Sequence, residues 1–230
     1  MRKYIAEFIG TFGIVFFGTG SIIVNDITSG AITHLGISMT FGVIVTLMIY
    51  SFAEISGAHF NPAVTIGLLT KTRMSTKNIL AYIISQILGA LFGSYLLHLL
   101  FPISLNLGAT IPSGSEWQSL LLETILMFFL MLVIFQSTHY ALTKSLAGVL
   151  IGGTVLLEAL VAGPISGASM NPARSIGPAI ISGNLTVLWI YLLAPISGAL
   201  IAGAAHFILV SVPSLHKEEK SEVQDYLAND

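Results

Sequence analysis

Six long apolar runs dominate this 230-residue chain and limit the folds that it can adopt. They lie near residues 4–25, 34–54, 78–101, 117–138, 145–163 and 187–210. Each is close to the roughly 20 apolar residues that a helix needs to cross a bilayer, and the runs do not alternate as the strands of a membrane β-barrel do. With 54% hydrophobic and only 9% charged residues, the chain is too apolar for an ordinary soluble domain. The runs therefore predict an all-α membrane protein with six transmembrane helices.

The basic residues predict the orientation of these helices. Eight of the nine Lys and Arg residues fall on one side of the predicted membrane: Arg2, Lys3, Lys71, Arg73, Lys77, Lys144, Lys217 and Lys220. Cytoplasmic loops carry an excess of Lys and Arg, so we expect both termini in the cytoplasm. We expect the membrane to be the plasma membrane. The first run contains Glu7 and lacks a small-residue cleavage site, which favours a membrane helix over a removed signal. Residues 214–230 are predicted to form a charged cytoplasmic tail.

Composition excludes several classes of function. The net charge of −2 and the lack of a basic stripe argue against nucleic-acid binding. The chain has no cysteine, which excludes disulfides, thiol catalysis and Cys-ligated metals, and its six histidines show no ligand spacing. Neither a metal site nor a cofactor is expected.

Two segments of the chain are copies of each other. Residues 55–67 read ISGAHFNPAVTIG and residues 165–177 read ISGASMNPARSIG, with nine of thirteen positions identical. Each copy follows the second helix of a set of three, so we divide a single domain, 1–213, into repeats of approximately 1–110 and 111–213. Three crossings per repeat invert the second repeat relative to the first. The two motifs are therefore expected to enter the membrane from opposite surfaces and to face each other.

Each copy contains the tripeptide Asn-Pro-Ala, formed by Asn61, Pro62 and Ala63 and again by Asn171, Pro172 and Ala173. Asn is a preferred N-cap and Pro a preferred first helical residue, so each tripeptide predicts a helix start. The apolar stretches that follow, 63–69 and 173–181, cover only about two turns, roughly half a bilayer. They are predicted to be re-entrant half-helices.

The Ser-Gly-Ala segments ahead of the tripeptides indicate a water-filled path. Their carbonyl groups cannot all be paired, and unpaired backbone inside a membrane is tolerated only where it is buried in protein or lines water. Two half-helix N-termini that meet at the midplane place positive dipole ends there, which disfavours cations and hydronium. The asparagine side chains are expected to donate hydrogen bonds to a passing oxygen.

With these motifs the chain resembles the aquaporin, or major intrinsic protein, family over nearly its whole length, from AEFIGT at 6–11 through both Asn-Pro-Ala loops to the last helix. The segment 162–179, AGPISGASMNPARSIGPA, is most similar to plant nodulin-like intrinsic proteins and their bacterial relatives. The resemblance implies a homotetramer with one pore per subunit. It also implies a passive channel that lets water and small uncharged solutes across the bilayer and excludes ions and protons.

The family's aromatic and arginine selectivity filter is carried over by the resemblance to Phe41, Ala159, Ala168 and Arg174. Strictly water-selective members usually have His at the place of Ala159, so this filter is expected to be wider and to lack one donor. Glycerol facilitators usually carry Trp in place of Phe41 and Asp in place of Ser175, which makes the filter intermediate. We expect glycerol-like polyols among the solutes, with metalloid hydroxides as a further class. Arg174 would cost about 2.5–3.5 kcal/mol inside a bilayer on insertion scales, which favours a place facing the pore.

Three glutamates belong to the predicted helices near these sites. By resemblance, the carboxylates of Glu7 and Glu123 accept hydrogen bonds from backbone N–H groups of the half-helix loops and serve as their scaffold. Glu158 stands beside the filter position at 159, and two interpretations of it remain open. It lines the vestibule, or it holds the loop between the third and fourth helices.

Glycines four residues apart predict close contacts between helices. They occur at Gly89 and Gly93 and again at Gly148 and Gly152. This spacing lets helix backbones approach each other in membranes, so a packing role is expected.

An ion-coupled secondary transporter is the alternative to a passive channel, and a membrane enzyme is the third function class. A transporter generally has acidic or cationic groups at the midplane, whereas both half-helices here start with neutral Asn-Pro-Ala. An enzyme needs a nucleophile with a base or a metal cluster, and the predicted helices supply neither. We therefore expect a non-enzymatic channel, while saturation and ion coupling of the flux would favour the transporter.

Overall fold

The computed structural model describes residues 1–71 and 74–211, and the regular elements within these ranges are all helical. Six helices of the described ranges are long and apolar enough to cross a membrane. They are α1 (Arg2–Ile27), α2 (Thr33–Ser56), α4 (Thr76–Leu100), α5 (Glu116–His139), α7 (Ala147–Ser166) and α9 (Leu188–Ser211). The prediction of an all-α membrane protein with six crossings is confirmed. Arg73 and the predicted tail, 214–230, lie outside the described residues.

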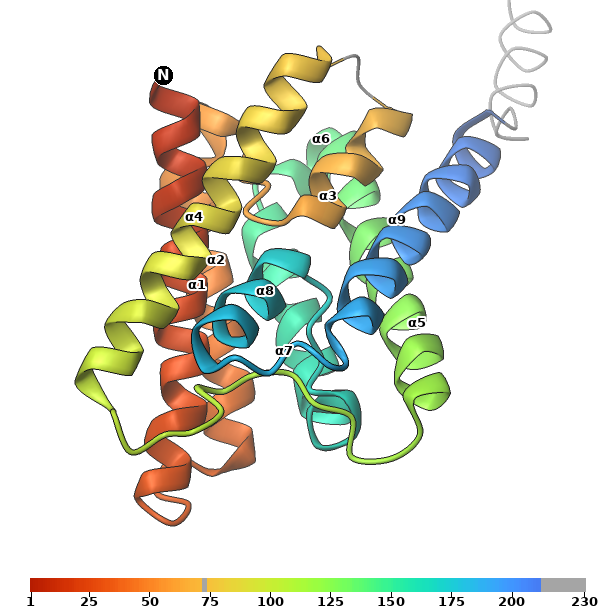
Figure 1. Cartoon of the computed structure of the whole chain (residues 1–230). Helices are drawn as coiled ribbons and strands as arrows, with labels where there is room; N and C mark the ends of the chain where they lie inside the picture. Colours follow the sequence, from red (N-terminus) through yellow and green to blue (C-terminus); the bar gives the residue numbers. More distant parts are fainter. Residues whose placement is uncertain (72–73, 212–230) are drawn as a thin grey trace, which may run out of the picture.

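Two shorter helices begin at the Asn-Pro-Ala tripeptides. α3 (Pro62–Gly67) continues into the 3-10 turn η1 (Leu68–Thr70), and α8 (Pro172–Ser182) is eleven residues long. Neither reaches the roughly 20 residues that a crossing needs. In Figure 1 they lie between the long helices, with α3 nearer than α8 to the end that carries the N-terminus. The predicted half-helices are therefore present, although the first tightens to 3-10 geometry before the predicted end at 69.

One further helix, α6 (Ala141–Lys144), connects α5 to α7 and was not predicted. Four residues are too few to show a helical periodicity in the sequence, which explains why the pattern gave no indication of it.

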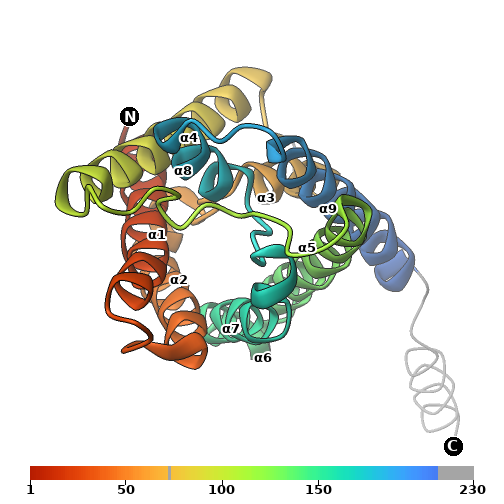
Figure 2. The same cartoon turned by 60° about the horizontal axis from the view of Figure 1, so that its bottom comes forward.

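The long helices form a ring around a central opening (Figure 2). α1 packs against α4 and α5 packs against α9, so each of these pairs lies within one repeat. α2 packs against α7 and joins the two repeats. α3 contacts α9 and α8 contacts α4, so each half-helix also packs on a helix of the other repeat. Each half-helix contacts both α4 and α9, so the two half-helices lie between these two long helices.

Glycines allow the closest helix contacts, as the sequence predicts. A Cβ added to Gly89 of α4 would lie 2.4 Å from the carbonyl oxygen of Phe8 in α1. A Cβ added to Gly152 of α7 would lie 2.5 Å from the carbonyl oxygen of Gly42 in α2. Both distances are below van der Waals contact, so only glycine fits without a shift of the helices. The close contacts are confirmed at both positions.

Candidate functional site

The two Asn-Pro-Ala tripeptides form equivalent helix caps. The Oδ1 of Asn61 accepts hydrogen bonds from the backbone N–H groups of the two residues after the proline, at 2.8 and 3.4 Å. The Oδ1 of Asn171 accepts from the corresponding N–H groups at 3.0 and 3.4 Å. Proline at the first helical position has no N–H that would need a partner. Each asparagine Oδ1 thus accepts hydrogen bonds from its own half-helix. Each side-chain amide nitrogen can donate hydrogen bonds to other groups.

The amide nitrogens of the two asparagines tie the repeats together. The Nδ2 of Asn61 donates to the carbonyl of Met170 at 2.8 Å, and the Nδ2 of Asn171 donates to the carbonyl of Phe60 at 3.0 Å. A side-chain amide carries two N–H groups, so one on each asparagine remains for another acceptor. Both asparagines line the central cavity described below. The arrangement can therefore offer two donors to an oxygen at the meeting point of the half-helices.

The loops ahead of the asparagines have a strained backbone. In the first loop φ is 53° at Ala58 and 51° at Phe60, and in the second it is 41° at Ala168 and 49° at Met170. A non-glycine residue in the left-handed region costs roughly 1–2 kcal/mol. Such conformations persist only where the surrounding structure holds them.

Glu7 of α1 is fully buried and holds the first loop. Its Oε1 accepts from the Ser56 hydroxyl at 2.6 Å and from the backbone N–H of His59 at 3.0 Å. Its Oε2 accepts from the backbone N–H of Phe60 and from the side-chain amide of Gln86, both at 2.7 Å. Four donors converge on one carboxylate, as a buried charge requires.

Glu123 of α5 holds the second loop in the same way. Its Oε1 accepts from the Ser166 hydroxyl at 2.7 Å and from the backbone N–H of Ser169 at 2.9 Å. Its Oε2 accepts from the backbone N–H of Met170 at 2.8 Å. Glu123 is also fully buried, and one side-chain donor fewer reaches it than reaches Glu7.

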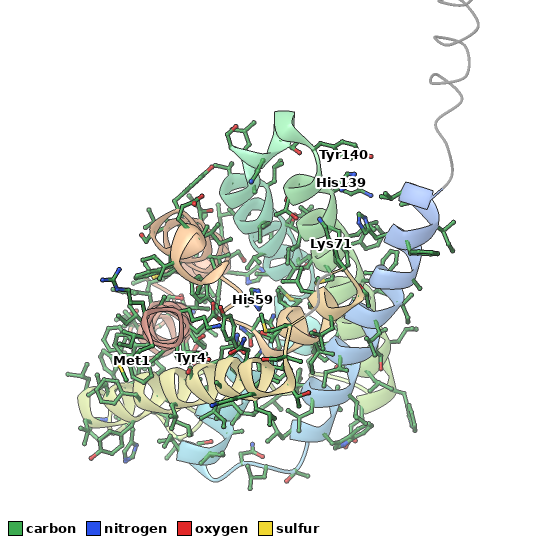
Figure 3. All side chains as sticks on the ribbon, turned by 90° about the horizontal axis from the view of Figure 1, so that it is seen from above. Met1, Tyr4, His59, Lys71, His139 and Tyr140 are labelled. Carbon is green, nitrogen blue, oxygen red and sulfur yellow. The ribbon has the colours of Figure 1, made fainter. Side chains whose placement is uncertain are left out.

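One cavity of about 720 Å³ passes both half-helix loops. Its lining includes Lys71 and Lys144 at one end, His59, Asn61 and Asn171 in the middle, and Phe41, Ala159, Ala168 and Arg174 toward the other end. We call these two ends the lysine end and the arginine end. Figure 3 looks along the cavity from the end that carries the N-terminus, with His59 near the middle of the ring. Residues of both repeats line the cavity, so neither repeat forms it alone.

The structure brings the four predicted filter residues together around the cavity. The Arg174 side chain is 2% exposed, and its Nη1 donates to the carbonyl of Gly108 at 2.9 Å. Its guanidinium carbon lies 5.2 Å from the centroid of the Phe41 ring. Ala159 and Ala168 line the same cavity and contribute only methyl groups. The charge of Arg174 is thus fixed in place at the wall of the cavity.

Two residues that hold Glu7 and Arg174 were not predicted from the sequence: Gln86, which donates to Glu7, and Gly108, whose carbonyl accepts from Arg174. Gln86 is a buried amide in the apolar helix α4, and a lone amide in such a run is the signal that could have indicated it. Gly108 lies in the loop between α4 and α5 with φ of 65°. The loop has no periodic pattern, so the glycine residue type was the single sequence signal at that position.

Neither interpretation of Glu158 is supported by the structure. Its side chain is buried, and its Oε2 has no hydrogen-bond partner among the described residues. It is not one of the residues that line the cavity. In the described part of the chain, no group of three or more His, Cys, Asp or Glu side chains could hold a metal ion.

Comparison with known proteins places this geometry in context. A model of the family described as "Major intrinsic protein" matches residues 1–206. The "Probable aquaporin NIP-type" of Nicotiana alata is 47% identical over 212 residues, which cover 91% of this chain and 78% of that protein. Nodulin-26 of Glycine max is 39% identical over 229 residues, which cover 99% of this chain and 84% of that protein. The X-ray structure of the aquaglyceroporin from Plasmodium falciparum matches with a TM-score of 0.81 at 27% identity, covering 91% of this chain and 96% of that chain.

Proposed function

The chain belongs to the major intrinsic protein family and is a passive channel for water and small solutes, and from this premise we propose which solutes it admits. It is a channel and not an enzyme, and the resemblance seen in its sequence is confirmed. The proposed solutes are water and glycerol-like polyols, with undissociated metalloid hydroxides as a further class. Ions and protons are excluded.

The observation that carries this proposal is the composition of the arginine end of the cavity. Ala159 and Ala168 are small side chains that line the cavity with Phe41 and Arg174, which supports the passage of a solute wider than water. Arg174 has five N–H donors and no acceptor, which suits the hydroxyl oxygens of a polyol or a hydroxide. The similarity to an aquaglyceroporin supports the same solute class.

Exclusion of ions follows from charge and from donor geometry. Arg174 is a fixed positive charge at the cavity wall, and it repels cations. Where the half-helices meet, the asparagine amides offer donors to the oxygen of a passing water. An oxygen that accepts two hydrogen bonds is less available to receive a proton from the next water. We propose the two Asn-Pro-Ala tripeptides as the central constriction and Arg174 with Phe41, Ala159 and Ala168 as the selectivity filter.

The remaining features of the proposal concern the whole protein. Glu7 and Glu123 are proposed as the scaffold of the loops, and residues 1–213 as one channel domain with a cytoplasmic tail at 214–230. Lys71 and Lys144 line one end of the cavity. Because Lys and Arg are more frequent on the cytoplasmic side of a membrane protein, this supports a cytoplasmic position for that end and for both termini. We propose a homotetramer in the plasma membrane, with one pore in each subunit.

Light scattering of proteoliposomes in a stopped-flow instrument tests the solutes. Shrinkage under an impermeant osmolyte measures water flux, and reswelling under a glycerol gradient measures glycerol flux. We expect both to exceed the rates of protein-free liposomes, without saturation and without dependence on an ion gradient. Fast water flux with no glycerol entry would refute the proposed solute range. Saturable, ion-coupled flux would instead favour a transporter.

A further inference from the structure

Helix α7 contains a proline one turn beyond the filter. Pro164 has no backbone N–H, so it cannot donate to the carbonyl four residues earlier, which belongs to Leu160. Leu160 directly follows the filter residue Ala159. The helix therefore lacks its own hydrogen bond at the point where α7 presents Ala159 to the cavity.

His34 supplies the missing donor from the neighbouring helix. Its Nε2 lies 2.7 Å from the carbonyl oxygen of Leu160. Because a carbonyl oxygen only accepts, the Nε2 of His34 carries the hydrogen and donates it. His34 lies in the first turn of α2, two turns before Phe41 on the same face. The bond therefore joins the two helices that carry Phe41 and Ala159.

Two other hydrogen bonds run from side chains of α2 to backbone carbonyls of the α6–α7 segment. The Thr46 hydroxyl donates to the carbonyl of Gly148 at 3.2 Å, and the Tyr50 hydroxyl donates to the carbonyl of Ser145 at 3.0 Å. Both lie toward the lysine end, away from the filter. Of these three bonds, only the one from His34 is adjacent in sequence to a filter residue.

We propose that His34 is a positioning residue of the filter, whose Nε2–H replaces the N–H that Pro164 lacks and so fixes the distance between Ala159 and Phe41. His34 is exposed and does not line the cavity, so it acts through α7 and not on the solute. The inference rests on the proposed filter and extends it to a residue outside the pore. Loss of the bond would free α7 to move away from α2 and widen the opening beside Ala159.

The test compares variants by the ratio of glycerol flux to water flux in proteoliposomes. His34→Leu removes the donor, and we expect the ratio to rise about twofold to tenfold, the range that one net hydrogen bond covers. His34→Gln keeps an N–H donor and is expected to stay close to the original ratio. Tyr50→Phe removes a comparable bond at the lysine end and should leave the ratio unchanged.

A second substitution separates positioning from general stability. Pro164→Ala restores a backbone N–H that can bond to the Leu160 carbonyl within α7. In the double variant with His34→Leu, it should return the ratio to the original value, even if His34→Leu alone folds poorly. Failure of this rescue, or an unchanged ratio in a well-folded His34→Leu channel, overturns the positioning role.

Ala159→His in the same assay distinguishes failure of this inference from failure of the proposed filter. If Ala159→His lowers the ratio and His34→Leu leaves it unchanged, only the positioning role is refuted. If neither changes the ratio, the filter itself is refuted and the inference with it.

Discussion

Replacing Glu123 by Gln tests whether this carboxylate holds the second loop in its strained shape. The amide oxygen of Gln can take the place of Oε1 and accept from Ser166 and Ser169. The amide NH₂ then faces the backbone N–H of Met170, where Oε2 now accepts at 2.8 Å. One hydrogen bond to a charged group is lost, at a cost of about 1.5–3 kcal/mol. This loss is similar in size to the roughly 1–2 kcal/mol that the left-handed conformation of Met170 costs.

The loop should therefore leave its present conformation in a substantial fraction of molecules. The carbonyl of Met170 accepts from Asn61, so a shift of Met170 also removes the tie between the two half-helices. We expect the water flux per channel to fall, because each 1.4 kcal/mol changes the ratio of the two loop conformations tenfold. The thermal midpoint in detergent should fall by about 4–8 °C for a loss near 2 kcal/mol.

Glu116→Gln is the matched control, because Glu116 is an exposed residue in the first turn of the same helix. It should change neither the water flux nor the thermal midpoint by more than the small effect of a helix-end charge. If Glu123→Gln and Glu116→Gln behave alike in both measurements, Glu123 does not hold the loop.

Three further predictions follow from the pore and its walls. Ala159→His should add a donor and narrow the opening, so glycerol flux should fall more than water flux in proteoliposomes, and an unchanged ratio would contradict the proposed filter. The chain has no cysteine, so mercurials should not inhibit water flux, and inhibition that thiols reverse would contradict a pore lined by this chain alone. Gly152→Val should force α2 and α7 apart, because its Cβ would lie 2.0 Å from the Thr46 Oγ1 and 2.5 Å from a backbone oxygen. We expect Gly152→Val to lower the thermal midpoint. Gly153→Val is the control, because a Cβ at Gly153 meets no atom within 4 Å, and equal midpoints for the two variants would contradict the prediction.

The parts of the structure that local chemistry determines were predictable from the sequence. Asn61 and Asn171 cap their half-helices as residue type and the following proline require. The repeat indicated that the two motifs face each other, because inversion follows from counting three crossings. The four proposed filter residues were named from the resemblance, and they do meet at the cavity.

Contacts between segments that are far apart in the sequence could not be predicted from sequence patterns. The donation from Asn61 to the carbonyl of Met170 depends on how the two loops meet, and a side-chain amide can take many partners. The carbonyl of Gly108 carries no side-chain signal, yet it fixes Arg174. Glu158 shows the opposite case, because its position in the sequence suggested a function and the structure gives it no hydrogen-bond partner at Oε2 among the described residues.

The differences between the repeats explain how a symmetric frame produces an asymmetric channel. Nine of thirteen motif positions are identical, and these include the residues that cap the half-helices. Four motif positions differ between the repeats. At one of them the first repeat has Val64 and the second has Arg174, and both side chains line the cavity at equivalent places in α3 and α8. Valine gives the lysine side an apolar wall, whereas arginine gives the other side a fixed charge with donors. The difference at this one position of a duplicated helix therefore places a charged side chain at only one end of the cavity, where we propose the filter, while residues of both repeats line the path between the ends.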